Sequence, residues 1–170
     1  MIEPQVLNQV KGVLAKLSTT FTFVVERNLD DEKTKSYCNF VEDVASCSEL
    51  ITVQYREGRN FKLSIARNGE DTGISFSGIP NGHEFTSLLL ALLNGDGQGR
   101  NLPDAALTRR IKALQGDMQL KTYVSLTCTN CPDVVQALNV MALLNPAISN
   151  ETVDGALHQD EIEKLNIQAV

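Results

Sequence analysis

The chain has 170 residues, of which 42% are hydrophobic and 5% aromatic, and its formal net charge at pH 7 is −6; this length is typical of one domain or two small ones. The acidic balance and the lack of a basic run argue against a nucleic acid as partner. The longest strongly apolar run, residues 88–93, is too short to cross a bilayer. Residues 1–5 lack the basic and apolar regions of a signal peptide. We therefore expect a cytoplasmic protein with no membrane partner.

The first half of the sequence alternates between helical and strand periodicity. The predicted elements are a helix over 6–17, a strand over 21–25, a helix over 35–48, strands over 50–55, 61–65 and 73–76, and a helix over 84–93. The last two strands are predicted to form a hairpin joined through Asn68-Gly69. The order helix, strand, helix, three strands and helix indicates a thioredoxin-like fold.

A glycine-rich stretch over residues 95–100 separates the two halves. It follows a helix instead of a strand, and its spacing differs from the G-x-G-x-x-G of nucleotide-binding loops, so we interpret it as a linker. We therefore predict an α/β protein made of two fused thioredoxin-like folds, one over 1–97 and one over 101–170. The same absence of a dinucleotide fingerprint predicts that this chain itself binds no FAD or nicotinamide nucleotide.

The second half begins the same order of elements again, with Pro103 suited to the first turn of its helix. The predicted elements are a helix over 103–114, a strand over 120–126, a helix over 131–144 that ends before Asn145-Pro146, a strand over 147–153 and a short helix over 159–165. The closing hairpin and helix of the first half have no counterpart before Val170. We therefore expect the second fold to be incomplete in this chain.

An incomplete second fold predicts exposed hydrogen-bonding edges on the strands over 120–126 and 147–153. The first fold, a second copy of the chain, or residues that follow Val170 in a longer protein would each cover them. We favour the third explanation, because the chain would otherwise stop inside a structural unit and domains usually end at linkers.

The most informative motif is Cys128-Thr129-Asn130-Cys131, between the strand over 120–126 and the helix over 131–144. A thioredoxin-type dithiol requires a strand that delivers C-x-x-C to a helix start. Unpaired N–H groups and the macrodipole favour a thiolate there, and thiols in such motifs have pKa values of roughly 3.5–7.5. The thiolate attacks, and the second cysteine resolves the mixed disulfide. We expect Cys128 to be the attacking residue, since it lies closest to the free N–H groups, and Cys131 to be more shielded.

Other interpretations of the cysteines are weaker. A zinc site needs two more ligands at chelating spacing, but no second C-x-x-C exists and both His83 and His158 are isolated. A purely structural disulfide would close a very short loop and gain little stability. Cys38 and Cys47, nine positions apart in the predicted helix, face opposite sides and are expected to be small buried residues.

Three stretches resemble the N-terminal domain of the flavoprotein component of alkyl hydroperoxide reductase. They are the specific string Cys131-Pro132-Asp133-Val134-Val135-Gln136-Ala137-Leu138-Asn139 with its upstream cysteine, Gly82-His83-Glu84-Phe85, and Val153-Asp154-Gly155-Ala156. The resemblance implies that electrons pass from NADH through FAD in a C-terminal reductase module to this dithiol, which reduces a partner peroxiredoxin. It also implies that Glu84 lies near the dithiol with an acid–base or electrostatic role, and it is compatible with a homodimer of the full-length protein.

The chain departs from the family pattern at Thr129, where histidine is common, and lacks the cis-proline segment expected after Val170. An acidic residue in a first helical turn is also favoured by the macrodipole alone, so Glu84 has a purely structural explanation too. Two other functions remain open: a stand-alone tandem protein disulfide oxidoreductase, disfavoured because the first half has no C-x-x-C, and a non-catalytic binding module. Reactivity of Cys128 toward an alkylating reagent would separate redox chemistry from binding.

Overall fold

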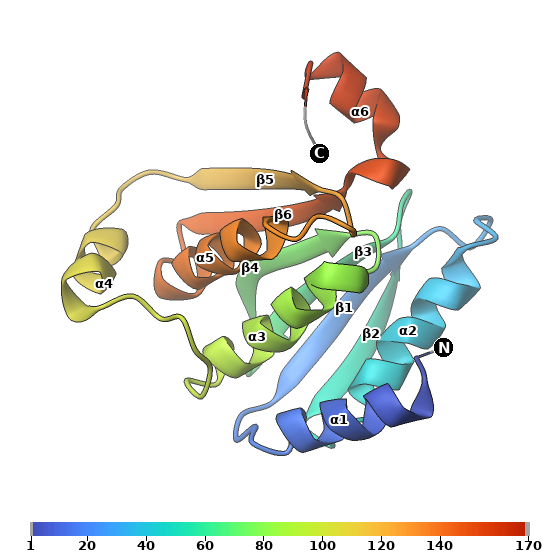
Figure 1. The fold of residues 1–170 in the computed structure, drawn as a ribbon, viewed down its shortest axis with the longest axis horizontal. Helices are drawn as coiled ribbons and strands as arrows, with labels where there is room; N and C mark the ends of the chain where they lie inside the picture. Colours follow the sequence, from blue (N-terminus) through green and yellow to red (C-terminus); the bar gives the residue numbers. More distant parts are fainter. Residues whose placement is uncertain (1, 169–170) are drawn as a thin grey trace.

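The structure is a computed structural model and describes residues 2–168 (Figure 1). Among these residues the helices are α1 (Pro4–Leu14), α2 (Thr34–Ala45), α3 (Phe85–Gly95), α4 (Ala105–Lys112), α5 (Cys131–Leu144) and α6 (Gln159–Lys164), with short 3-10 helices η1 (Gly82–Glu84) and η2 (Gly155–Leu157). The strands are β1 (Phe21–Arg27), β2 (Ile51–Glu57), β3 (Lys62–Arg67), β4 (Glu70–Ser77), β5 (Met118–Val124) and β6 (Ile148–Asp154). The predicted α/β class and the thioredoxin-like order of elements are confirmed; the predicted chain ends at residues 1 and 170 lie outside the described residues.

The six strands form one sheet in the order β2-β1-β3-β4-β6-β5, which runs through both halves of the chain (Figure 1). The halves meet where β4 pairs in parallel with β6 over Ile74–Ser77 and Asn150–Val153. The two halves also repeat one pairing, since β1 joins β2 with Phe21 opposite Ile51 and β5 joins β6 with Met118 opposite Ile148. The repeated order of elements in the sequence therefore corresponds to a repeated parallel pair in the sheet.

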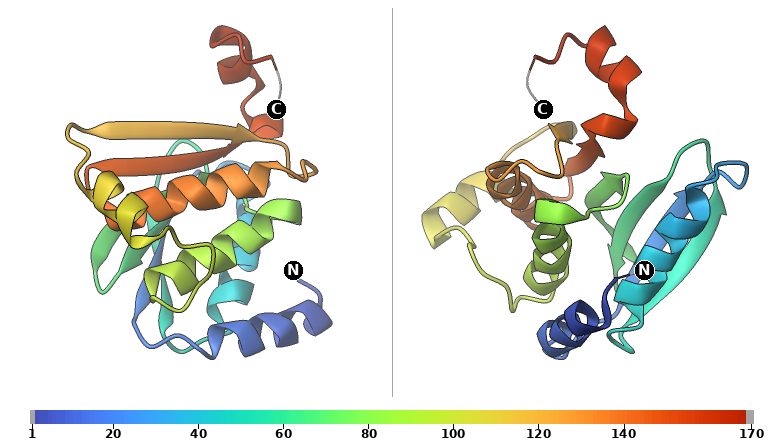
Figure 2. Two further views of the ribbon diagram at one scale, coloured as in Figure 1. Left: turned by 60° about the vertical axis from the view of Figure 1, so that its left-hand side comes forward. Right: turned by 45° about the vertical axis from the view of Figure 1, so that its right-hand side comes forward.

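One face of the sheet carries the hydrophobic core. Helices α1, α2, α3 and α5 supply side chains to a single buried cluster with the inward residues of the strands, including Phe23, Leu63 and Phe76. Two views confirm that α3 and α5 run side by side, in agreement with the contacts between them (Figure 2). Polar side chains of the opposite face include Lys62 and Glu151, which form an ion pair of 3.1 Å across the junction of the two halves. This alternation of apolar and polar residues is the reason that these segments form strands with one covered face.

The β3–β4 hairpin has the turn that its sequence predicts. Arg67 pairs with Glu70, so Asn68 and Gly69 alone form the loop. Their φ angles are 51° and 84°. Positive φ at both central residues defines the type I′ turn that matches the twist of a two-stranded hairpin, and Asn-Gly adopts it at low cost.

Most predicted boundaries differ from the observed ones by a few residues, and two of the differences concern residues singled out above. Pro103 lies before α4 instead of inside its first turn, because the Asp104 carboxylate accepts a hydrogen bond of 2.7 Å from the Leu107 N–H and caps the helix one residue later. Cys47 lies beyond the end of α2 at Ala45. The buried state of both Cys38 and Cys47 is confirmed, with 6% and 8% of their surfaces exposed.

The prediction that the strand over 147–153 has an exposed edge is also wrong. β6 lies between β4 and β5, so the first half of the chain covers the edge that the second half leaves open. Within the described residues β5 is one of the two outer strands of the sheet, at the opposite side from β2, with α6 beyond it (Figure 1). The division into two folds at residues 97 and 101 stays a prediction, while the sheet itself is continuous.

Asp96, in the linker, joins the end of α3 to the loop before β1. Its carboxylate accepts hydrogen bonds of 2.8 Å from the Thr19 N–H, 2.6 Å from the Thr19 hydroxyl, 3.0 Å from the Ser18 N–H and 2.7 Å from the Gln98 amide. Partial burial raises the pKa of Asp96, but the bonds from Thr19, Gln98 and Ser18 together outweigh it and hold the pKa below its usual value.

Asp96→Ala is expected to lower the free energy of unfolding at pH 7 by about 2–3 kcal/mol, since bonds to a charged acceptor are lost. Because the folded-state pKa is depressed, this stabilisation is present above the unfolded pKa of about 3.9 and disappears as the pH falls through the folded value. Denaturant unfolding at pH 7 measures the loss of stability, and the same experiment at acid pH measures how much of that loss disappears. The matched control is Asp117→Ala, at an exposed position; equal losses in the two variants would contradict the role of Asp96.

Candidate active site

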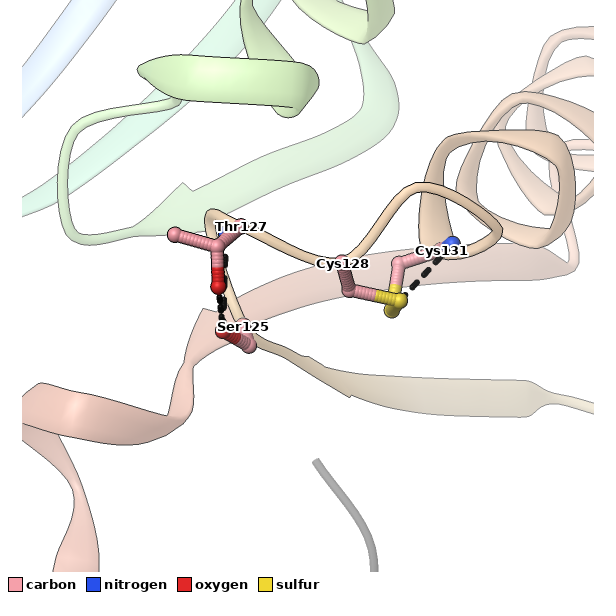
Figure 3. The surroundings of a disulfide bond; sticks show 4 residues. All are labelled: Ser125, Thr127, Cys128 and Cys131. Carbon is pink, nitrogen blue, oxygen red and sulfur yellow. Dashed lines mark hydrogen bonds between the residues drawn. A yellow bond between two sulfur atoms is a disulfide. The ribbon is translucent and has the colours of Figure 1, made fainter.

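The two cysteines of the motif form a disulfide at the start of α5 (Figure 3). β5 ends at Val124, three loop residues follow, and Cys128 then precedes the helix, whose first residue is Cys131. The Cys131 N–H donates a hydrogen bond of 3.1 Å to the Cys128 sulfur. An N–H group at a helix start that points at this sulfur stabilises negative charge on it when the disulfide opens.

The loop before the disulfide is held by short-range hydrogen bonds. The Cys128 N–H donates to the Ser125 carbonyl at 2.9 Å, and the Ser125 and Thr127 hydroxyls share a bond of 3.0 Å (Figure 3). Both cysteines are half-buried, and Cys131 packs against the hydrophobic core. Thr129 is exposed, so the residue that departs from the family pattern faces solvent. The loop is therefore a fixed turn that leads the strand into the helix.

The first half of the chain contributes η1 to the same place. The His83 N–H donates a hydrogen bond of 3.1 Å to the Leu126 carbonyl, two residues before Cys128. Gly82 has a φ of 55°, and a Cβ at this position would collide with the Leu126 carbonyl oxygen. Only glycine permits this close approach at low cost. The seam between the halves thus runs directly beside the disulfide loop.

Glu84, the last residue of η1, is 0% exposed. Neither of its carboxyl oxygens has a hydrogen-bond partner among the described residues. Burial raises the pKa of Glu84, and the nearby Ser87 hydroxyl and His83 offset only part of this effect. A fully buried carboxyl without partners is costly to ionise, so its environment keeps the proton on Glu84 to higher pH than usual.

The structure adds two residues that sequence reasoning missed, Thr152 and Asp154 on β6. Both line a cavity of about 10 Å³ together with Glu84, Val124 and Leu126. The Thr152 side chain is 3% exposed and its hydroxyl has no hydrogen-bond partner in the described part of the chain, while Asp154 is 9% exposed. A polar residue at an inward position of a strand is the signal that could have identified Thr152, since the register of β6 with β4 places it opposite Phe76.

Of the two histidines, His83 belongs to η1 beside the disulfide loop, but it is exposed. His158 lies elsewhere, beside α6, where it faces Glu161 at 3.9 Å. In residues 2–168, no three His, Cys, Asp or Glu side chains lie close enough together to hold a metal ion. Within the same range no helix is both long and apolar enough to span a bilayer.

Curated proteins are similar to this chain over most or all of its length, although no family model matches. The chain is 41% identical over 172 residues to the alkyl hydroperoxide reductase protein AhpF of Pseudomonas aeruginosa, covering 100% of this chain and 33% of that protein. It is 46% identical over 142 residues to a protein of Bacillus subtilis named NADH dehydrogenase, covering 83% of this chain and 28% of that protein. The chain therefore spans about a third of the length of the curated relatives it matches.

Solved structures agree with this assignment. The N-terminal domain of alkyl hydroperoxide reductase AhpF from Enterococcus faecalis superposes with a TM-score of 0.90 at 30% identity, covering 100% of this chain and 88% of that domain. A protein disulfide oxidoreductase from Aeropyrum pernix has the same fold, with a TM-score of 0.87 at 17% identity over 99% of this chain and 81% of that one.

A thioredoxin-like fold with a C-x-x-C disulfide at a helix start defines a thiol–disulfide oxidoreductase. Within this class, the chain belongs to the family of the N-terminal domain of alkyl hydroperoxide reductase AhpF. The predicted family is confirmed.

Proposed function

We infer that this domain passes electrons from an NADH- and FAD-dependent reductase module to the disulfide of a peroxiredoxin and so supports hydroperoxide reduction. The observation that carries the proposal is the Cys128–Cys131 disulfide at the start of α5, in a chain that is similar over its whole length to the corresponding domain of AhpF. The P. aeruginosa protein is about three times as long as this chain, which leaves room there for a reductase module.

The reaction is a two-step thiol–disulfide exchange. The Cys128 thiolate attacks one sulfur of the partner disulfide, and the first partner thiolate leaves as a mixed disulfide forms. The Cys131 thiolate then attacks the Cys128 sulfur and releases the second partner thiolate. The domain ends with the Cys128–Cys131 disulfide and the partner with two thiols, so two electrons and two protons have passed to the partner. A reductase module returns the two electrons that reopen the disulfide.

Glu84 is proposed to exchange a proton with Cys131 during these steps. The Glu84 carboxyl is buried without a hydrogen-bond partner among the described residues, and η1, which carries it, bonds to the disulfide loop. Both observations support this role, as does the resemblance of the Gly82-His83-Glu84-Phe85 stretch to the family. A carboxyl with a raised pKa can accept the proton when the Cys131 thiol becomes a nucleophile. It can return the proton when the Cys131 sulfur becomes a leaving group.

The test compares two oxidised protein substrates with the reduced domain. An oxidised bacterial peroxiredoxin with two cysteines is expected to be reduced at least about tenfold faster than insulin, because a dedicated partner adds specific binding to the same exchange chemistry. Thiol release is measured by stopped-flow at equal substrate concentrations. Equal rates with both substrates would favour the stand-alone disulfide oxidoreductase, and the absence of thiol release from either would favour a binding module.

A further inference from the structure

The cavity beneath the disulfide loop gathers buried polar groups that have no partners. Glu84 and Thr152 come from opposite halves of the chain, and the polar atoms of both side chains are buried without hydrogen bonds among the described residues. Buried polar groups are normally satisfied by protein or by ordered water. A cavity of about 10 Å³ accommodates one water molecule, and a bound water needs at least two polar partners. Three side chains of the lining, Glu84, Thr152 and Asp154, can supply such partners. The fourth polar side chain of the lining, Ser77, already bonds to Glu151.

Asp154 is the third of these side chains and lies one inward position further along β6 than Thr152. Its Oδ1 atom accepts a hydrogen bond of 3.0 Å from the Ala156 N–H at the start of η2. With 9% of its surface exposed, Asp154 is the group of the three that reaches the protein surface. Two further titratable groups interact with these carboxyls: His83 lies beside Glu84, and the pKa of Tyr37 of α2 is raised by burial and by the charge of Asp154.

We propose that Glu84, Thr152 and Asp154 hold a single water molecule and that this water connects the buried Glu84 carboxyl with solvent through Asp154. This inference rests on the proposed proton exchange between Glu84 and Cys131. Glu84 is fully buried and its raised pKa favours the protonated form, so its carboxyl needs a route by which it loses its proton to solvent before it takes the proton of Cys131. Thr152 is a positioning residue here, because its hydroxyl orients the water and does not touch the reacting sulfurs.

The transfer is balanced as a relay of one proton. The Glu84 carboxyl gives its proton to the water, the water passes one of its own protons to the Asp154 carboxylate, and Asp154 releases it to solvent. The water is regenerated and no electron moves. In the opposite direction, the same path recharges Glu84 after it has protonated the Cys131 sulfur. The step that this path serves is the second thiol–disulfide exchange, and the first attack by Cys128 does not use it.

An aromatic disulfide reagent that releases one coloured thiolate at each exchange step separates the two steps in a stopped-flow experiment. Thr152→Val, which keeps the side-chain volume, and Asp154→Asn are expected to leave the first phase unchanged and to slow the second about tenfold. Thr152→Ser restores the hydroxyl and should restore the rate. The matched control is Thr122→Val, the same substitution at the position opposite Thr152 on β5, which does not line the cavity.

Infrared spectroscopy of the Glu84 carboxyl gives a readout that does not depend on activity. The C=O band, assigned by its loss in Glu84→Gln, should move to higher frequency in Thr152→Val because the carboxyl loses its bond to the ordered water, and it should stay in place in Thr122→Val. An unmoved band and an unchanged second phase in both Thr152→Val and Asp154→Asn would overturn the relay. If Glu84→Gln itself leaves the second phase unchanged, the proposed role of Glu84 fails, which is a different result.

Discussion

Cys128→Ser should abolish disulfide reduction by this domain, with a loss of at least about four orders of magnitude in rate, as is typical when a covalent nucleophile is removed. The Cys128 sulfur accepts the Cys131 N–H at the helix start, so it is the sulfur whose thiolate the backbone stabilises. Cys131→Ser, in contrast, should still complete the first exchange and then accumulate a stable mixed disulfide with an oxidised partner. Non-reducing electrophoresis and intact mass measurement detect this adduct.

The remaining cysteines provide matched controls. Cys38→Ser and Cys47→Ser change buried thiols that the disulfide does not include, so the rate of exchange should stay within about twofold of the original protein, because residues outside the reacting group contribute little to this step. If the adduct forms with Cys128→Ser and not with Cys131→Ser, the assignment of the attacking and resolving cysteines is reversed.

Glu84→Gln is expected to slow the second exchange step about a hundredfold, which lies within the usual range for a positioned acid or base. The same substitution is expected to stabilise the fold at neutral pH by about 1–3 kcal/mol, because it removes the cost of an ionisable carboxyl without partners in a buried site. A gain of stability combined with a loss of activity is characteristic of a functional group that the fold holds at a cost.

The pH dependence distinguishes this effect from simple repacking. Burial raises the folded-state pKa of Glu84 above its unfolded value of about 4.3. The folded state therefore holds the proton more tightly, so this group lowers the stability of the original protein progressively as the pH rises from the unfolded value through the folded one. The advantage of Glu84→Gln in denaturant unfolding should be small at pH 4 and grow with pH across this window.

The control for this prediction is Glu49→Gln, at an exposed position. The substitution should change neither stability nor rate by more than a small amount at any pH. An advantage of Glu84→Gln that is the same at acid and neutral pH would show that ionisation of Glu84 in the folded protein is not the cause.

Much of the fold is predictable from local sequence. The strand, C-x-x-C and helix around residues 118–144 follow from alternation, the helix-start motif and the helical spacing of apolar residues, and α5 has the predicted bounds. The Asn68-Gly69 turn sets the β3–β4 hairpin because only a few backbone conformations close a two-residue loop. These features depend on residues that are near each other in the chain.

The tertiary structure alone decided the pairing of β4 with β6 and the cavity that Glu84 shares with Thr152 and Asp154. The position of Glu84 near the dithiol was implied by the family resemblance and by no local pattern of the chain. β4 and β6 are about seventy residues apart, and no turn fixes the register of two parallel strands that are not consecutive in the chain. The sequence by itself determined that a dithiol begins a helix. The burial of Glu84 and the polar groups that share its cavity depended on how the two halves join in one sheet. The free energy of that junction comes from long-range packing and strand pairing, which leave no local pattern in the sequence.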